Sequence, residues 1–331
     1  MKRINNMMAL MATTAVMALT ATAALSTAAL ADGAKIFVIG GKADDPFWSI
    51  VKRGAEDAGK VVEAQGGSVT WLGPQNYDNL GADAADLIRN AIAQKADAIV
   101  GPDWVPEAMD EAFKAVVAAK IPLIIYNAGG LDAADRLGAL NYVGSDDYLA
   151  GFAAGEYFGK KNLKKIVCVN TLPGAANLQA QCKGMTDGIV KQGGSGETLP
   201  LPMSTFGNPT AVAEAVKAYL LQHTDIVGVY TIGNVDANSA SIAITQAGAA
   251  DRVKLGGVNM DQTILDNIKA GNQMFAIDQQ GYLQGYLAVS MLNGYFNYGL
   301  NVASRPILTG PGIIDAANVD ATMSGVALGA R

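Results

Sequence analysis

Short apolar runs alternate with longer amphipathic stretches along the chain after residue 32. The apolar runs predict strands at 35–41, 68–74, 97–102 and 122–127. Between them, apolar residues recur three and four positions apart, which predicts helices at 46–67, 80–96 and 105–121. The strand runs are continuously apolar instead of alternating, as expected where helices cover both faces of a parallel sheet.

The same alternation starts again in the second half of the chain. It predicts strands at 165–170, 225–233 and 254–259, with helices at 145–161, 177–192, 209–223, 237–248 and 264–271. One more helix is expected at 281–296, and the residues after it show no strong periodicity. Two successive series predict an α/β fold of two doubly wound parallel-sheet lobes instead of one large sheet.

The first residues have the pattern of an export signal. Lys2 and Arg3 precede an uncharged run at 7–30, and Ala29-Leu30-Ala31 forms a small-x-small cleavage site. A membrane anchor is the alternative, because the run is long enough to span a bilayer, but its many Ala and Thr residues make it only mildly apolar. We therefore expect a signal peptide at 1–31, cleaved after Ala31, and a periplasmic mature chain.

Charge and composition narrow the functional classes. The chain of 331 residues has a formal net charge of −6, and without 1–31 it carries 22 Lys and Arg against 30 Asp and Glu. An acidic chain without basic blocks disfavours nucleic acid as a partner. The single histidine, His223, lies at a helix-to-strand junction, where we interpret it as a solvated helix-end residue. One histidine cannot build the zinc sites that need several imidazoles.

Catalytic motifs are also missing from the sequence. The segment VIGGKADDP follows a strand but lacks both the dinucleotide-binding and the P-loop glycine spacing. The residues at 143–147 do not form a nucleophile elbow. We therefore expect a protein that is not an enzyme and that needs neither a cofactor nor a metal.

Cys168 and Cys182 both remain after cleavage of the signal. Cys168 lies in a predicted strand and Cys182 in the helix that follows, and such a pair can reach disulfide distance. An exported, oxidising compartment favours a disulfide, and two buried free thiols are the alternative.

Polar and aromatic side chains follow the carboxyl ends of the predicted strands, where ligands bind in open α/β sheets. These strand-end residues are Lys42, Asp44, Asp45, Phe47, Trp48, Asp103, Trp104, Asn127, Asn170, Asn234, Asp236, Asn259, Asp261, Asp278, Gln279 and Gln280. Carboxylates and amides bond adjacent hydroxyls, and aromatic faces stack on the C–H faces of a sugar. The set indicates a neutral, polyhydroxylated ligand. For any single Asp or Asn, the alternative is a helix cap or a turn.

Several ordered segments together carry a family resemblance. They are IFVIGGKADDPFWSIVKRGAEDAG, ADAIVGPDW, KIPLIIYNAG, YVGSDDYLAGFAAGEYF, NTLPGAANLQAQCKGM, KLGGVNMDQTILDNIKAG and AIDQQGYLQGYLAV. In this order, behind a signal peptide, they resemble the ribose-binding branch of the periplasmic sugar-binding proteins of ABC transporters (type I periplasmic binding proteins). The similarity extends over nearly all of the mature chain.

The resemblance implies two lobes that close over a ligand by hinge motion and are joined by three crossovers, near 142–145, 279–281 and 305–309. The N-terminal lobe would comprise 32–143 plus 280–306. The C-terminal lobe would comprise 144–279 plus 307–331.

The resemblance also implies a ligand shell. Residues that match the family's binding positions are Asp45, Phe47, Trp48, Asn127, Gln181, Phe206, Asn234, Asn259 and Gln279. Strand-end position and chemistry add Asp103, Trp104 and Asp278. Two arginines that grip ribose in the family are here Ala128 and Gln181, which favours a different aldose or a sugar alcohol over ribose.

The function expected from these features is the capture of a monosaccharide or sugar alcohol and its delivery to the permease subunits of an ABC transporter. A ligand-presenting sensor for a chemoreceptor or sensor kinase is the alternative, and a secreted α/β enzyme is less favoured. We expect a monomer.

Overall fold

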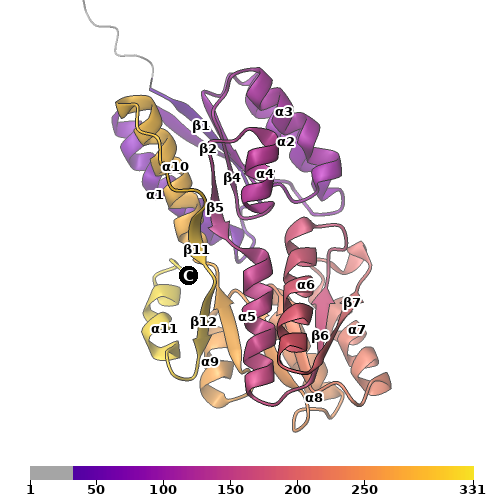
Figure 1. Cartoon of the computed structure of the whole chain (residues 1–331). Helices are drawn as coiled ribbons and strands as arrows, with labels where there is room; N and C mark the ends of the chain where they lie inside the picture. Colours follow the sequence, from indigo (N-terminus) through magenta and orange to yellow (C-terminus); the bar gives the residue numbers. More distant parts are fainter. Residues whose placement is uncertain (1–32) are drawn as a thin grey trace, which may run out of the picture. The chain divides into compact units, whose positions relative to one another are not determined.

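Two six-stranded sheets organise residues 33–331, the part of the chain that the computed structural model describes (Figure 1). The predicted signal peptide at 1–31 lies outside these residues. The first sheet has the order β11-β5-β4-β3-β1-β2, and its paired strands run parallel. Its strands are β1 (Lys35–Ile39), β2 (Ser68–Leu72), β3 (Ala98–Gly101), β4 (Leu123–Tyr126), β5 (Asn141–Ser145) and β11 (Ile307–Gly310).

The second sheet repeats the same order, as β12-β10-β9-β8-β6-β7. Its strands are β6 (Lys165–Asn170), β7 (Ser195–Pro200), β8 (Gly228–Ile232), β9 (Lys254–Val258), β10 (Phe275–Asp278) and β12 (Gly312–Asp315). The pair of β10 and β12 is antiparallel, and the other pairs are parallel. The predicted α/β class with two doubly wound lobes is confirmed.

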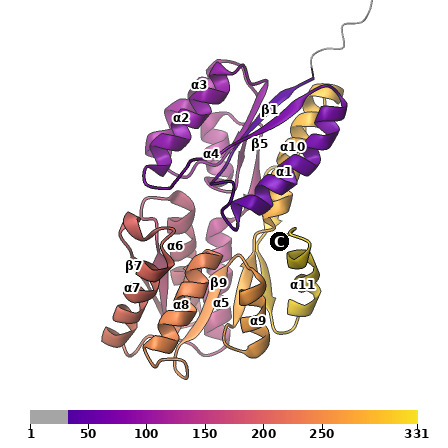
Figure 2. The same ribbon diagram turned by 180° about the vertical axis from the view of Figure 1, so that it is seen from behind.

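Helices cover both faces of each sheet. In the first lobe, α1 (Trp48–Ala64) and α10 (Gly281–Tyr298) cover one face, and α2 (Leu80–Ala93), α3 (Pro106–Ala118) and α4 (Gly130–Leu137) cover the other (Figure 1). In the second lobe, α5 (Asp147–Lys160) and α6 (Ala176–Lys191) cover one face. Figure 2 shows the opposite face, with α7 (Pro209–Gln222), α8 (Asn234–Gln246), α9 (Gln262–Ala270) and α11 (Val319–Ala327). Within residues 33–331, no helix has the length and apolar character needed to cross a membrane.

Glycines allow the paired helices to approach closely. A Cβ atom on Gly54 of α1 would overlap the carbonyl oxygen of Tyr282 in α10, and one on Gly285 of α10 would overlap that of Val51 in α1. Because these contacts join the backbones directly, α10 is held against α1 although more than 200 residues separate them (Figure 1). Helix α10 therefore belongs to the first lobe.

The chain crosses between the two sheets three times. It leaves the first sheet after β5, returns between β10 and α10, and crosses again between β11 and β12. The predicted boundary at 306/307 is wrong by four residues, because Ile307–Gly310 pairs in parallel with β5 and so belongs to the first sheet. The predicted boundary at 143/144 is also early, since β5 continues to Ser145.

The order of the strands determines where a ligand-binding crevice forms. In each sheet the first strand along the chain, β1 or β6, lies between the second and the third, so the direction of winding reverses beside it. A crevice opens outside the carboxyl ends of the strands at such a reversal, and ligands bind there. The two crevices of this chain lie at the facing ends of the lobes.

Candidate functional site

A cavity of about 130 Å³ lies between the carboxyl ends of the two sheets. Residues from both lobes line it: Asp45, Phe47, Trp48, Tyr77, Leu80, Trp104, Asn127, Leu172, Asn177, Leu178, Phe206, Gly207, Ile232, Gly233, Asn234, Val235, Asp236, Asn259 and Gln279.

An aromatic cluster forms the wall on the first lobe. Trp48, the first residue of α1, meets Trp104 edge to face at a ring-centroid distance of 5.2 Å, and Phe47 meets Trp48 at 5.2 Å. Tyr126 supports the ring of Trp48 from β4, at 6.0 Å. Since Trp48 and Trp104 are both buried, their rings are held rigidly and can offer a flat surface to the C–H groups of a ligand.

Asp45 places a carboxylate beside this wall. Its Oδ1 accepts hydrogen bonds from the backbone N–H groups of Phe47 (2.9 Å) and Trp48 (3.1 Å) at the start of α1. Its Oδ2 accepts one from the hydroxyl of Tyr77 at 3.0 Å. Asp45 therefore both caps a helix and lines the cavity, so the capping alternative does not exclude a ligand contact. The remaining lone pairs of the carboxylate can accept hydrogen bonds from hydroxyls.

Asp236 supplies a second carboxylate from the other lobe. It lies in the first turn of α8, and its Oδ2 accepts a hydrogen bond from the hydroxyl of Thr171 at 2.9 Å. The pKa of Asp236 is raised to about 7, mainly by burial and also by the negative charge of Asp45, while the hydrogen bond from Thr171 counteracts the rise. The two acids thus face one cavity from opposite lobes.

Amide side chains complete the polar lining. Asn127 donates to Oε1 of Gln284 at 3.1 Å, and Gln279 donates to Oδ1 of Asn259 at 2.9 Å. These bonds fix the orientation of four amides, and all but Gln284 line the cavity. The Oδ1 atom of Asn177 is buried and has no hydrogen-bond partner within residues 33–331. A buried acceptor without a partner is costly, so a hydroxyl donor of a ligand would relieve it.

Comparison of the sequence with known proteins shows which family the chain belongs to. The model of the periplasmic binding protein domain matches residues 36–299. The chain belongs to the periplasmic binding protein family. The family resemblance predicted from the sequence is thereby confirmed.

Related proteins bind sugars and polyols. The binding protein is 24% identical over 305 residues to the xylose/arabinose-binding protein XylF of Sulfolobus acidocaldarius, covering 86% of this chain and 72% of the relative. A carbohydrate transporter from Acidothermus cellulolyticus, solved with myo-inositol, superposes with a TM-score of 0.81 at 28% identity, over 90% of this chain and 99% of that one. An ABC transporter solute-binding protein from Agrobacterium vitis with D-fucose has a TM-score of 0.77 at 23% identity, over 88% and 99%.

Nine of the predicted ligand residues line the cavity of the binding protein. They are Asp45, Phe47, Trp48, Trp104, Asn127, Phe206, Asn234, Asn259 and Gln279. The other three, Asp103, Gln181 and Asp278, are not among the residues that line it.

Asp103 lies behind the cavity wall. Its side chain is fully buried and forms an ion pair with Arg136 (Oδ2 to Nη2, 2.7 Å), while the next residue, Trp104, points into the cavity. Burial raises the pKa of Asp103, and the hydrogen bond from Arg136 counteracts this. One carboxylate oxygen of Asp103 is thus paired with Arg136, and the other, Oδ1, is buried without a hydrogen-bond partner among residues 33–331.

Gln181 is buried inside the second lobe. Its amide nitrogen donates to Oδ1 of Asp147 at 2.9 Å, and its oxygen accepts from the hydroxyl of Tyr230 at 3.0 Å. Both ends of the amide have hydrogen-bond partners within the lobe, and Gln181 does not line the cavity.

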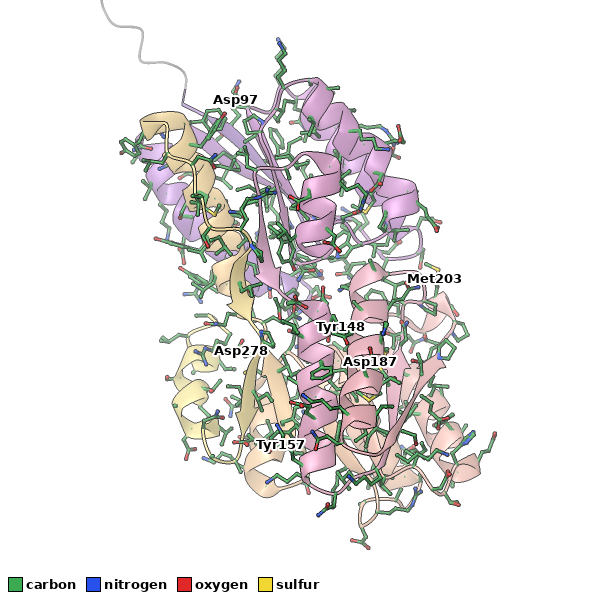
Figure 3. The ribbon with its side chains drawn as sticks, in the orientation of Figure 1. Asp97, Tyr148, Tyr157, Asp187, Met203 and Asp278 are labelled. Carbon is green, nitrogen blue, oxygen red and sulfur yellow. A yellow bond between two sulfur atoms is a disulfide. The ribbon has the colours of Figure 1, made fainter. Side chains whose placement is uncertain are left out.

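Asp278 lies beside the crossover into α10 (Figure 3). Its Oδ1 accepts from the backbone N–H of Gln280 at 2.7 Å, and its Oδ2 lies 3.4 Å from Arg331. It lines a small cavity of about 10 Å³ with Arg331, and burial raises its pKa. This small cavity shares Phe47, Asn234 and Asn259 with the main cavity, so Asp278 lies next to the main cavity without lining it.

Sequence reasoning missed several lining residues. Asp236 was recognised as a residue at a strand end but was not predicted to bind the ligand. Tyr77 follows β2, and no residue after that strand was considered in the prediction. Asn177 and Leu178 lie in the first turn of α6, and the apolar part of the lining also includes Leu80, Leu172, Ile232 and Val235. Reading every strand end with equal weight would have found Tyr77 and Asp236.

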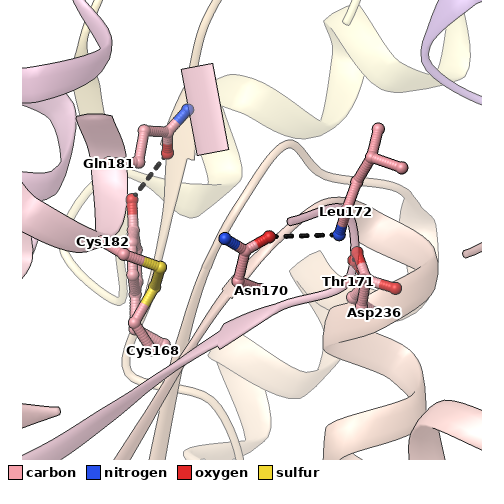
Figure 4. The surroundings of a disulfide bond; sticks show 8 residues. Cys168, Asn170, Thr171, Leu172, Gln181, Cys182 and Asp236 are labelled. Carbon is pink, nitrogen blue, oxygen red and sulfur yellow. Dashed lines mark hydrogen bonds between the residues drawn. A yellow bond between two sulfur atoms is a disulfide. The ribbon is translucent and has the colours of Figure 1, made fainter. Parts of the chain in front are cut away.

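The predicted disulfide is confirmed. Cys168 in β6 and Cys182 in α6 are bonded, with their Cα atoms 5.5 Å apart, so the alternative of two free thiols is wrong (Figure 4). The bond fastens α6 to its sheet. Since Asn177 and Leu178 lie at the start of α6, the disulfide supports the helix that carries part of the cavity wall.

Proposed function

We propose that this periplasmic binding protein captures one neutral monosaccharide or sugar alcohol between its lobes and delivers it to the permease subunits of an ABC transporter. The observation that carries the proposal is the cavity, which combines an aromatic wall with carboxylates from both lobes. Aromatic faces suit the C–H side of such a ligand, and carboxylates suit its hydroxyls.

The charge of the cavity supports a neutral ligand. Asp45 and Asp236 line it, whereas its lining residues, all within 33–331, include no Lys, Arg or His. A phosphate or carboxylate on the ligand would lie beside two acids without a cation to pair with, which is electrostatically unfavourable. Sugar phosphates and sugar acids are therefore disfavoured.

The relatives narrow the first ligands to test. The name of the Sulfolobus relative gives xylose and arabinose, and the Acidothermus structure contains myo-inositol. All three are neutral rings that carry several hydroxyls, which is the chemistry that the lining of the cavity suits. We propose that D-xylose, L-arabinose and myo-inositol are the best first probes.

The proposed delivery of the ligand to a transporter is supported by the predicted export of the chain and by the absence of a catalytic motif in its sequence. The predicted signal at 1–31 would export the chain to the periplasm, and cleavage after Ala31 would release it. We propose that the protein binds and releases its ligand without changing it. A bound ligand recovered unaltered after long incubation would support this role, and a new product would contradict it.

A thermal-shift screen of residues 32–331 tests the proposal. The panel contains neutral pentoses, hexoses and cyclitols, together with their phosphates, amino acids and nucleosides. We expect one or more neutral sugars or polyols to raise the melting temperature, because a ligand that binds only the folded state stabilises it. A shift produced only by amino acids, nucleosides or phosphates would contradict the ligand class. Delivery is tested by deleting the gene, which should abolish uptake of the ligand identified; unimpaired uptake would contradict that part.

A further inference from the structure

Two aromatic rings from opposite lobes meet at the cavity. Tyr77 lies in the loop between β2 and α2 of the first lobe, and Phe206 follows the short 3-10 helix Met203–Thr205 of the second. Their ring centroids lie 4.9 Å apart and the planes cross at 72°, an edge-to-face contact. Both residues line the cavity, and both rings are partly buried.

The hydroxyl of Tyr77 makes a second connection, within the first lobe. It donates to Oδ2 of Asp45 at 3.0 Å and accepts from the backbone N–H of Lys42 at 3.1 Å. Burial and the adjacent charge of Asp45 raise the pKa of Tyr77 well above its usual range, so the hydroxyl stays protonated and remains a donor. One side chain therefore holds a cavity carboxylate with its hydroxyl and touches the opposite lobe with its ring.

Two other hydrogen bonds between the lobes do not combine these two roles. The backbone N–H of Ala176 donates to the carbonyl oxygen of Trp104 at 2.9 Å, and Arg53 of α1 donates to the carbonyl oxygen of Leu328. The first involves backbone atoms, and the second joins residues outside the main cavity. Opening the cavity by separating the lobes at this flank has to pull the rings of Tyr77 and Phe206 apart.

We propose that Tyr77 is a positioning residue that links ligand recognition to lobe closure. Its hydroxyl holds Asp45 in the orientation that meets the ligand, and its ring packs on Phe206 to keep the lobes closed over it. The proposal rests on the proposed function for its ligand, but the contact between the lobes can be tested without one. Its main consequence is a slow release of bound ligand.

A double-mutant cycle in the ligand dissociation rate tests the ring contact. D-xylose, L-arabinose and myo-inositol serve as probes for wild type, Tyr77→Leu, Phe206→Leu and the double variant. An edge-to-face pair supports about a two- to tenfold faster release when either ring is lost. If the rings contact each other, the increase in release rate of the double variant should be smaller than the product of the increases in the two single variants, by that two- to tenfold factor. If the increases in release rate of the two single variants simply multiply in the double variant, the proposal that the contact between the rings holds the lobes closed is overturned. We call this contact between the rings of Tyr77 and Phe206 the latch.

Tyr77→Phe separates the two roles. This variant keeps the ring and removes the hydroxyl, so its coupling to Phe206→Leu should remain as in wild type while affinity falls through Asp45. When Asp45 is already replaced by Asn, adding Tyr77→Phe should reduce affinity much less than it does in the wild-type protein. An equal reduction of affinity with and without Asp45→Asn would contradict the proposal that the Tyr77 hydroxyl positions Asp45. Tyr298→Leu, a change at an exposed tyrosine of α10, is the matched control and should leave release unchanged.

A measurement without ligand distinguishes failure of the latch from failure of the proposed function. If no neutral probe binds wild type, the ligand class has failed, and hydrogen exchange of the ligand-free protein decides the latch. Phe206→Leu should speed amide exchange at 75–79 in the first lobe, and Tyr77→Leu should speed exchange at 203–208 in the second. Exchange changes confined to the mutated lobe in both variants would overturn the proposal.

Discussion

Trp48 and Trp104 meet edge to face across the cavity wall, with ring centroids 5.2 Å apart and an interplanar angle of 89°. They come from two different strand ends, those of β1 and β3, on either side of the point where the winding of the first sheet reverses. The contact fixes both indoles, so each can serve as a preformed surface for a ligand. The aromatic wall is thus a product of the strand order.

Loss of this wall should weaken binding. We expect Trp48→Ala to reduce affinity at least tenfold, about 1.4 kcal/mol, because the variant removes stacking area and frees the ring of Trp104. Isothermal titration measures the change. Trp71→Phe is the matched control, since Trp71 touches Trp48 but does not line the cavity, and its affinity should stay near that of wild type. Equal losses in both variants would contradict the assignment of the wall.

Binding should depend on pH through Asp236. Burial raises the pKa of this carboxyl to about 7, so it takes up a proton below that pH. Ligand hydroxyls donate best to the ionised form, and binding to that form must release the proton. Affinity should therefore fall as pH drops below 7, by at most about tenfold per unit.

Substitution of two buried acids, Asp236 and Asp147, shows which of them causes the pH dependence of affinity. Asp236→Asn should flatten the pH profile of affinity measured by titration between pH 5.5 and 8. Asp147→Asn is the matched control, because burial also raises the pKa of Asp147 to about 7 although this residue does not line the main cavity. A profile that survives in Asp236→Asn and disappears in Asp147→Asn would contradict the role of Asp236.

Asp147 should instead govern stability. Its folded-state pKa of about 7 lies above the ordinary value of 3.8, so the carboxyl favours the folded state when protonated. This contribution is complete below the ordinary value, declines as pH rises and is lost above about pH 7. Relative to wild type, Asp147→Asn should therefore gain stability as pH rises from 4 to 7. Urea unfolding at several pH values measures this, and a constant difference between the two proteins would contradict it.

The disulfide should contribute to stability without touching the ligand. Cys168 and Cys182 are 14 positions apart in sequence, and closing a loop of that length stabilises a fold by about 3 kcal/mol. We expect the Cys168→Ala, Cys182→Ala double variant to lose that amount in urea unfolding while keeping its affinity. Unchanged stability, or a loss of affinity with retained stability, would contradict this account.

Much of the architecture is predictable because the buried strands are continuous apolar runs. Strands β1, β3, β4 and β6 are buried along nearly their whole length, so their sequences show no alternation and stand out from the helices. Strands β7, β11 and β12 are partly exposed and mixed in polarity, and the sequence pattern did not reveal them. It also missed β5 and β10, which are buried but are short and include polar residues. Missing β11 displaced the third crossover.

The site was less predictable than the fold, because neighbouring residues at a strand end point in different directions. Asp103 and Trp104 follow the same strand, yet the acid pairs with Arg136 and the indole lines the cavity. That outcome depends on where α4 places Arg136, which no local pattern encodes. Gln181 is similar, because its partners Asp147 and Tyr230 come from other elements of the lobe.

The central claim is that the cavity selects a neutral polyhydroxylated ring, and a matched pair of ligands tests it most directly. Isothermal titration compares the neutral sugar or polyol that gives the largest thermal shift with its own monophosphate. We expect one bound neutral molecule per chain and at least a hundredfold weaker binding of the phosphate, about 2.7 kcal/mol, because Asp45 and Asp236 face the site and no cation among residues 33–331 lines it. Equal or tighter binding of the phosphate would show that the cavity does not select a neutral ligand.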